Sequence, residues 1–534
     1  MSENKKYVIL EAGTGVGKSA IGVCVSRYLQ KHLKINNKFQ NSSYFLTTQK
    51  ILQQQYINDF SSNNILDDIE DSFPCNTFRS SPLPSQQQGL FRSISSATNY
   101  KCRSNPNNNC AEIRRINAKL GKFSNFNNDC KDDCVYKKTK ELFMEEVDGV
   151  TNFAYFLAET MYAKEFKPRK LLVIDEAHNC DLEMSGFIDM DINDEWREKL
   201  DIEIPTFITQ NEYYMWIKNT YEPLLMEKKK ELEKQLSNGN TNLINENEIY
   251  DKYACKVRRF IKYYHNDNWV MNITKIYNRL LGNKTDRLEF KPIDVSNYSS
   301  EMLFQFGHKV LLMSATILDK NKFCKLNGIN MNDATFISYS SPFPIENHPL
   351  RYYPIGSMGQ LHLDSSLPNL VKAIEKILKK HKNEKGIVHC HNYKIMKYIK
   401  NHINNKYRKR ILTHNSKNRD KILEQHMKST LPTVIISPSM SEGVDLKDEY
   451  SRFQVICKVP YPYLGDGMVK KRCDKWKWWY SYETTKRVVQ SVGRSVRNKN
   501  DHATTYILDK CWERFYQDNQ PLFPKNFHYW MSNG

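Results

Sequence analysis

The chain has 534 residues, too many for one hydrophobic core, so we expect two to four domains. Apolar residues make up 40% of it, and no apolar run reaches the roughly 20 residues of a membrane span. A formal net charge of +19 indicates either a solvated lysine-rich surface or a polyanionic partner. The first residues also lack a signal-peptide pattern. We therefore expect a soluble intracellular protein with no membrane partner, in the cytoplasm or at the nucleoid, or in the host cell if the source is viral.

The start of the chain predicts a parallel α/β sheet. Residues 6–10 form a short apolar strand, a glycine-rich loop follows, and a helix is expected over about 18–33. A second strand over 44–47 leads into another helix with one apolar face. That face consists of Leu52, Tyr56 and Phe60. Strand–helix alternation of this kind is typical of a doubly wound sheet.

The glycine-rich loop has the composition of a phosphate-binding loop in the required strand-to-helix context. Its glycines let backbone N–H groups turn towards phosphates, and the following helix contributes the positive end of its dipole. We expect Lys18 to contact the β- and γ-phosphates of ATP and Ser19 to bind Mg²⁺. The nucleotide-binding residues predicted here are Ala12, Gly13, Thr14, Gly15, Val16, Gly17, Lys18 and Ser19.

Residues 61–145 interrupt the regular pattern and contain a group of cysteines. The stretch is polar and rich in Asn and Ser, which indicates an insertion in the first sheet domain. Thiolates suit an iron–sulfur cluster and zinc equally, and buried structural thiols are a third interpretation. The last four cysteines are separated by 8, 20 and 4 positions, which matches no common zinc ribbon. The group consists of Cys75, Cys102, Cys110, Cys130 and Cys134.

A buried strand over 171–174 ends in two carboxylates. We expect Asp175 to hold Mg²⁺, directly or through water, and Glu176 to orient and deprotonate the attacking water. The alternative is a surface acidic pair that caps a helix. We favour the catalytic interpretation because this strand is expected beside the phosphate-loop strand.

Residues 186–290 are predicted to be a second, helical insertion. Residues 226–235 carry a long charged run, and residues 237–240 are expected to form a turn between two antiparallel helices. Solvated helix faces are the simplest interpretation of the charges.

The C-terminal part predicts a second parallel sheet, with strands over 386–389, 410–413, 433–437, 453–459 and 504–508. Arg494 and Arg497 are three residues apart, so on a helix they would share a face. With Gln490 and Gly493 at fixed offsets, they are candidates for arginine fingers that stabilise the transferring phosphoryl group. Nucleic-acid contacts or salt bridges are the alternative. In the aromatic run over 475–480, packing of a helix against the second domain is favoured over base stacking.

These segments together resemble the iron–sulfur helicases of the XPD/DinG type within helicase superfamily 2. The resemblance covers nearly the whole chain, and its motifs occur in the order of the family. The matching segments are residues 11–19, 46–53, 174–179, 312–317, 386–389, 439–445 and 490–497.

The resemblance implies two RecA-like α/β domains with a cysteine-rich Fe–S insertion and a helical arch insertion in the first. It implies a [4Fe–4S] cluster on Cys102, Cys110, Cys130 and Cys134, with Cys75 as the spare. The implied domains are 1–60, 146–185 and 291–335 for the first helicase domain, 61–145 for the Fe–S insertion, 186–290 for the arch and 336–534 for the second helicase domain.

The resemblance also implies an activity and further site residues. The chain is expected to be a DNA-stimulated ATPase that moves 5′→3′ on single-stranded DNA and unwinds forked or tailed duplexes, as a monomer. Ser314 and Thr316 would couple His178 to the second domain. Glu442, Gly443 and Asp445 would link the nucleotide to strand movement.

Two alternatives to a DNA helicase remain open at this level: an RNA- or hybrid-directed DEAH-type motor, and an ATP-gated DNA clamp that does not unwind. One departure from the family pattern concerns recognition of the nucleotide base. The glutamine that usually reads adenine lies upstream of the phosphate loop, and only ten residues precede Glu11. We therefore expect measurable hydrolysis of GTP or CTP as well as ATP.

Overall fold

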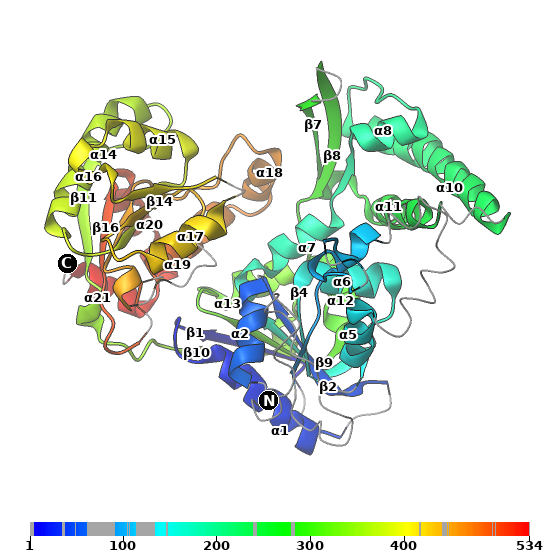
Figure 1. Ribbon diagram of the computed structural model, residues 1–534, viewed down its shortest axis with the longest axis horizontal. Helices are drawn as coiled ribbons and strands as arrows, with labels where there is room; N and C mark the ends of the chain where they lie inside the picture. The colour runs from blue at the N-terminus through cyan, green and yellow to red at the C-terminus, as the bar shows by residue number, and fades with distance from the viewer. Residues whose placement is uncertain are drawn as a thin grey trace.

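The structure is a computed structural model. It describes residues 5–34, 38–48, 50–60, 91–103, 105, 107–113, 134–145, 148–238, 243–278, 283–415, 418–440, 446, 448–493, 495–496 and 498–532. Two α/β domains lie side by side, and a third body projects from the first of them (Figure 1).

The first domain is built on a seven-stranded parallel sheet with the strand order β10-β1-β9-β5-β2-β4-β3. Its central strands are continuous apolar runs because helices cover both faces; all seven residues of β5 are buried. The strands are β1 (Tyr7–Ala12), β2 (Gln40–Thr47), β3 (Phe91–Ser93), β4 (Asp148–Asn152), β5 (Arg169–Asp175), β9 (Gly307–Ser314) and β10 (Ala334–Tyr339). The helices are α1 (Lys18–His32), α2 (Lys50–Phe60), α5 (Val135–Met144), α6 (Phe153–Ala158), α7 (Cys180–Ile188), α12 (Ser296–Met302) and α13 (Lys320–Asn327).

The second domain is built on a six-stranded parallel sheet with the order β11-β16-β15-β12-β14-β13. Its strands are β11 (Leu350–Gly356), β12 (Gly386–His389), β13 (Ile411–Thr413), β14 (Val434–Ser437), β15 (Phe453–Ile456) and β16 (Thr504–Asp509). The helices are α14 (Leu363–Lys380), α15 (Tyr393–His402), α16 (Asn405–Arg408), α17 (Arg419–Lys428), α18 (Gly467–Lys475), α19 (Trp479–Val492), α20 (Cys511–Asn519) and α21 (Lys525–Ser532).

The predicted α/β class with two parallel-sheet domains is therefore confirmed. All five strands predicted in the second sheet are present, and β12 has the predicted bounds. The edge strands β3, β10 and β11 were not predicted. β10 runs four residues past the domain boundary predicted at 335, because it pairs with β1 along its whole length.

The body over residues 186–290 is helical in its middle and ends in a sheet. Its helices are α8 (Asp194–Leu200), α9 (Gln210–Trp216), α10 (Glu222–Ser237) and α11 (Ile244–Tyr263). Its antiparallel sheet consists of β6 (Met190–Ile192), β8 (Asn283–Pro292) and β7 (Trp269–Asn278), in this order. β7 and β8 project away from the two large sheets (Figure 1).

The prediction that this whole segment is helical is wrong for β6–β8. In β8, Leu288 and Phe290 are fully buried, while the side chains of the alternate residues Arg287 and Glu289 form an ion pair at 3.1 Å. Burial of alternate residues is the period of a strand, and the charges on the other face concealed it.

No helix in the part of the chain that the structure describes is long and apolar enough to cross a membrane.

Candidate nucleotide cleft and cysteine group

The phosphate loop lies between the end of β1 and the start of α1, as its composition requires. Gly15 and Gly17 have φ angles of 80° and 81°, a left-handed conformation that glycine adopts without a steric penalty. The Lys18 ammonium donates to the carbonyl oxygens of Ala12 at 3.0 Å and Gly13 at 2.9 Å, so it lies within the loop. The first turn of α1 contains no acidic residue that would compete with a phosphate for the helix N-terminus.

The two predicted carboxylates lie at the carboxyl end of β5, two strands away from β1. Asp175 is buried, and its pKa is raised to about 6, first by burial and then by the Glu176 charge, while the Lys18 charge opposes the shift. Glu176 has a left-handed φ of 52°, which is a strained conformation for a residue with a side chain. Lys18 and the carboxylate pair therefore lie close enough to interact, and a bound cation would relieve the repulsion between the two carboxylates.

Tyr56 is a further member of this site, and the sequence does not predict its role. Its ring is buried, and its hydroxyl donates to Asp175 Oδ2 at 3.2 Å and also shares a hydrogen bond with the Ser19 side chain. The two predicted Mg²⁺ ligands, Ser19 and Asp175, thus meet at one tyrosine hydroxyl. In the sequence Tyr56 is only one member of an apolar helix face, so nothing distinguishes its hydroxyl from a ring packed in the core.

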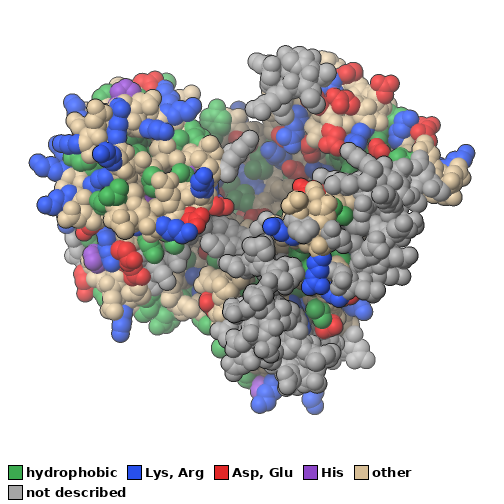
Figure 2. All heavy atoms as spheres, in the orientation of Figure 1, with side chains coloured by type: hydrophobic (Ala, Val, Ile, Leu, Met, Phe, Trp, Pro, Cys, Tyr) green, Lys and Arg blue, Asp and Glu red, His purple; other side chains and the backbone are tan. Residues whose placement is uncertain are grey.

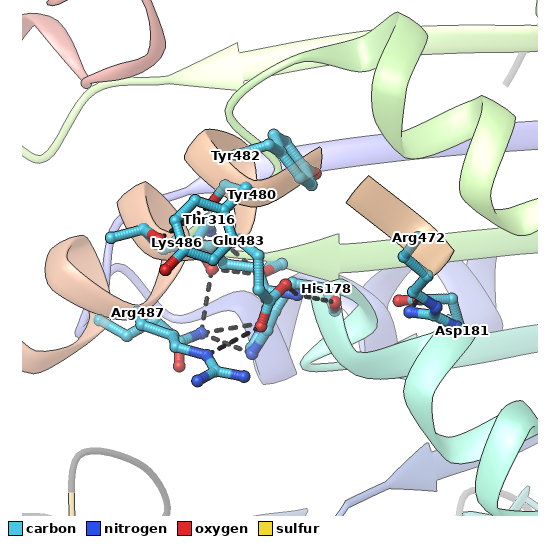
Figure 3. A network of polar contacts seen from close by, with 12 residues as sticks. His178, Asp181, Thr316, Arg472, Tyr480, Tyr482, Glu483, Lys486 and Arg487 are labelled. Carbon is cyan, nitrogen blue, oxygen red and sulfur yellow. Dashed lines mark hydrogen bonds and ion pairs between the residues drawn. The ribbon is translucent and has the colours of Figure 1, made fainter. Parts of the chain in front are cut away.

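Polar contacts connect His178, which lies beside the carboxylate pair, to the second domain (Figure 3). His178 Nδ1 lies 3.3 Å from Glu176 Oε2 and 2.8 Å from Ser314 Oγ. The Gln490 side-chain amide on α19 lies 2.5 Å from His178 Nε2 and donates to the Thr316 hydroxyl at 2.9 Å. His178 therefore lies between the residue expected to activate water and a helix of the other domain.

The end of α19 also contacts the phosphate loop. The Thr14 hydroxyl donates to the Gly493 carbonyl oxygen at 3.1 Å. α19 ends at Val492, and the described residues Ser495 and Val496 are not helical, so the helix expected over this segment is not found there. The last carbonyl of α19, that of Val492, accepts hydrogen bonds from the side chains of Gln454 and His348. Arg494 and Arg497 themselves lie outside the described residues, as do Glu442, Gly443 and Asp445.

A buried ion pair holds α18 against the first domain. The Arg472 guanidinium lies 2.8 Å from the Asp181 carboxylate on α7, with side-chain exposures of 1% and 4%. Arg472 Nε also donates to the Ile293 carbonyl at 2.8 Å. On the adjoining helix, the Lys486 ammonium donates to the His178 carbonyl at 3.0 Å (Figure 3).

The aromatic run before α19 packs at this domain interface. Trp476 and Trp479 are buried in one cluster with Leu326 of α13 from the first domain. Lys475 and Lys477 are exposed. The two rings pack as predicted rather than stack on bases, but their cluster includes the first domain as well as the second.

A cavity of about 700 Å³ lies between the domains, close to this interface. Phe187 of α7 lines it from the first domain, and His391, Tyr461 and Arg487 line it from the second. The pKa of His391 is lowered to about 4, chiefly by burial and further by the positive charges of Arg487 and Lys458. His391 is therefore neutral at physiological pH, and the charged residues that line the cavity are of both signs, since Arg487 forms an ion pair with Glu483 and Glu183 also lines it.

Three of the four predicted cluster cysteines come together. Cys102 and Cys134 both pack against the buried Ile113, and Cys110 hydrogen-bonds the Cys134 sulfur. This hydrogen bond is the main reason why the pKa of Cys134 is lowered to about 6, which favours the metal-binding thiolate. Cys75 and Cys130 lie outside the described residues. Among the described residues, no group of three or more His, Cys, Asp or Glu side chains is arranged to hold a metal ion.

Residues 374–531 match the helicase C-terminal domain family. The chain is 23% identical over 242 residues to the ATP-dependent DNA helicase DinG of Photobacterium profundum, a match that covers 42% of this chain and 34% of that protein. It is 25% identical over 201 residues to the ATP-dependent DNA helicase YoaA of Haemophilus influenzae, covering 35% and 30%. These matches support the assignment of the chain to the XPD/DinG type of superfamily 2 helicases.

The fold agrees with this XPD/DinG assignment over nearly the whole chain. A solved XPD helicase aligns with a TM-score of 0.59 at 15% identity, covering 97% of this chain and 95% of that one. The Xpd4 structure of S. tokodaii aligns with a TM-score of 0.54 at 14% identity, covering 96% and 94%. The sequence matches to DinG and YoaA, in contrast, span about a third of the length of those relatives.

Proposed function

We propose that this protein is an ATP-dependent DNA helicase, a DNA-stimulated ATPase that moves 5′→3′ on single-stranded DNA and unwinds forked or tailed duplexes as a monomer. The observation that carries the proposal is the chain of polar contacts from Glu176 through His178 to Gln490. This connection joins the carboxylate expected to activate water to a helix of the other domain. A change at the γ-phosphate can therefore reach the interface between the two domains.

In this mechanism each residue of the cleft has a defined task. Lys18 and the N–H groups of residues 13–19 bind the triphosphate, and Ser19 and Asp175 hold the Mg²⁺ that neutralises its charge. Glu176 orients a water molecule against the γ-phosphate and accepts its proton. Arg494 and Arg497, which lie outside the described residues, are the proposed arginine fingers for the γ-phosphate. Hydrolysis removes the γ-phosphate, which residues of both domains are proposed to contact, and the cleft between the domains then opens.

The cavity beside α7 and α19 is the proposed path of single-stranded DNA. Phe187 and Tyr461 line it and supply aromatic rings on which bases can stack, and Arg487, which is ion-paired with Glu483, is its basic residue. The lysines on the outer helices of the second domain do not strengthen the proposal. Figure 2 shows blue side chains spread over α14 and α15, which fits an ordinary solvated surface.

Unwinding of tailed duplexes tests the proposed activity and its polarity. We expect strand displacement with ATP and Mg²⁺ on a duplex with a 5′ single-stranded tail, and little on a matched duplex with a 3′ tail. A blunt duplex of the same sequence is the control. Displacement only from 3′ tails would contradict the polarity, and preferential displacement of an RNA strand would favour an RNA-directed motor. ATP-dependent binding of the tail without displacement would favour a clamp.

We further propose that Cys102, Cys110, Cys130 and Cys134 hold a [4Fe–4S] cluster. The support is the hydrogen bond between Cys110 and Cys134 and the packing of Cys102 and Cys134 on Ile113, together with the resemblance to XPD/DinG helicases. When bound, the cluster would tie the segment around Cys102 and Cys110 to the N-terminus of α5, which begins directly after Cys134.

Metal analysis checks the cluster independently of helicase activity. Protein purified without oxygen is expected to absorb broadly near 400 nm and to contain about four iron atoms per chain. Cys134→Ser is expected to lose the absorbance, whereas Cys255→Ser, at an exposed cysteine on α11, is expected to keep it. Colourless wild-type protein with one zinc per chain would contradict the assignment.

A further inference from the structure

The open edge of the first sheet lies directly beside the phosphate loop. β10 is the edge strand and pairs only with β1, in parallel and in register. In this register Tyr339, the last residue of β10, is level with Ala12, where the phosphate loop begins. The Tyr339 side chain is 59% exposed, so most of its ring is open to a ligand.

The Tyr339 ring lies on the face of the sheet that α1 covers. The Ser338 hydroxyl donates to Glu11 Oε2 on one face, so the next side chain, Tyr339, points to the opposite face. That opposite face is the one on which Leu10 and Ala12 pack in one cluster with Val23 of α1. Because α1 begins at the phosphate loop, Tyr339 and a bound phosphate chain would lie on the same side of the sheet.

The strand order fixes the direction in which a bound nucleotide extends. The γ-phosphate must face Asp175 and Glu176, which lie at the end of β5. β5 is separated from β1 by β9, whereas β10 lies on the opposite side of β1. A triphosphate centred on the loop therefore has its nucleoside end towards β10, and the side chain that it meets at the end of this strand is Tyr339.

The segment that follows β10 contacts the phosphate loop. A methyl group on the Gly13 Cα would lie 3.2 Å from the Ser341 Cβ, so the connection between the domains is already in contact with the phosphate loop. The Ser341 carbonyl accepts a hydrogen bond from the Asn526 side chain of α21 at 3.5 Å. Tyr339 is thus placed between the phosphate loop and a connection that the second domain holds in position.

We propose that Tyr339 is the residue on which the nucleotide base stacks. The inference rests on the proposed ATPase function and adds a binding residue to it. An aromatic ring stacks on the π-face of every base, so this contact favours nucleotides over bare phosphates without choosing adenine. The contact gives a physical reason to expect hydrolysis of GTP and CTP as well as ATP.

Calorimetric titration with ADP, CDP and inorganic tripolyphosphate tests the proposal, because tripolyphosphate has no base. Tyr339→Ala is expected to weaken ADP and CDP binding about tenfold and to leave tripolyphosphate binding within about twofold of wild type. Tyr339→Phe keeps the ring and is expected to bind ADP as the wild type does. Ile337→Ala is the matched control, since Ile337 is on the same face, two residues earlier, and 48% exposed.

Two results would overturn the proposal. Equal weakening of ADP and tripolyphosphate in Tyr339→Ala would mean that the loop is disturbed and that no base contact is lost. Unchanged ADP binding in Tyr339→Ala would exclude stacking at this residue. A wild-type protein that binds neither ligand would instead contradict the proposed ATPase function itself, so the two failures are distinguishable.

Discussion

Glu176→Gln is expected to lower the rate of ATP hydrolysis by about 10²- to 10⁴-fold, the contribution usual for a general base. Glutamine preserves the size of the side chain and a hydrogen-bond acceptor next to His178, but it does not accept a proton from water at neutral pH. Because Lys18, Ser19 and Asp175 are unchanged, ATP binding is expected to persist. Steady-state hydrolysis and the equilibrium binding of ATP, measured on the same preparation, separate the two effects.

The matched control is Glu198→Gln, which makes the same change at an exposed glutamate on α8 and is expected to hydrolyse ATP at the wild-type rate. A Glu176→Gln variant that hydrolyses ATP within about threefold of wild type would show that another group activates the water. Loss of ATP binding together with hydrolysis would instead assign Glu176 a role in holding the nucleotide.

Arg472→Met is expected to destabilise the protein by about 3–5 kcal/mol, because it leaves the Asp181 carboxylate buried without its partner. The contact that is lost lies at the interface between the domains. There α18 packs against α7, and the buried Trp476 and Trp479 adjoin α13. Urea unfolding followed by tryptophan fluorescence measures the effect. The first transition is expected to move to lower urea concentration, since unfolding of a chain with two domains need not be a single step.

Two further variants separate charge burial from simple loss of contact. Arg472→Met combined with Asp181→Leu removes both buried charges and is expected to recover most of the stability. Lys475, which is also on α18, forms an ion pair with Asp294 and is 38% exposed. Lys475→Met breaks this pair and is expected to lower the free energy of unfolding by less than about 1 kcal/mol. Equal destabilisation by Arg472→Met and Lys475→Met would contradict a special role for the buried pair.

The parts of the site that are local in sequence could be predicted. A glycine-rich loop between an apolar strand and a helix, and two carboxylates at the end of a second apolar strand, are each contained within about ten residues. Their positions follow from the rule that parallel strands present their carboxyl ends at one edge of the sheet. The alternation of strands and helices similarly predicts both large sheets.

The parts that depend on distant residues could not be predicted. Tyr56 joins the site only because its helix packs under the end of β5, and its sequence neighbours are those of an ordinary apolar face. The end of α19 depends on hydrogen bonds from Gln454 and His348, which lie far away in the sequence. The sequence predicts helix over β7 and β8 because charged residues alternate there with the few apolar residues that are buried.

The rate of ATP hydrolysis with and without single-stranded DNA is the most direct test of the central claim, which is that a cleft between two domains couples ATP hydrolysis to movement on DNA. Wild-type protein is expected to hydrolyse ATP several times faster when single-stranded DNA is present, because DNA that contacts both domains favours the closed cleft. Gln490→Ala, which breaks the contact with His178, is expected to remove most of this stimulation. Hydrolysis at the same rate with and without DNA in the wild-type protein would contradict the coupling.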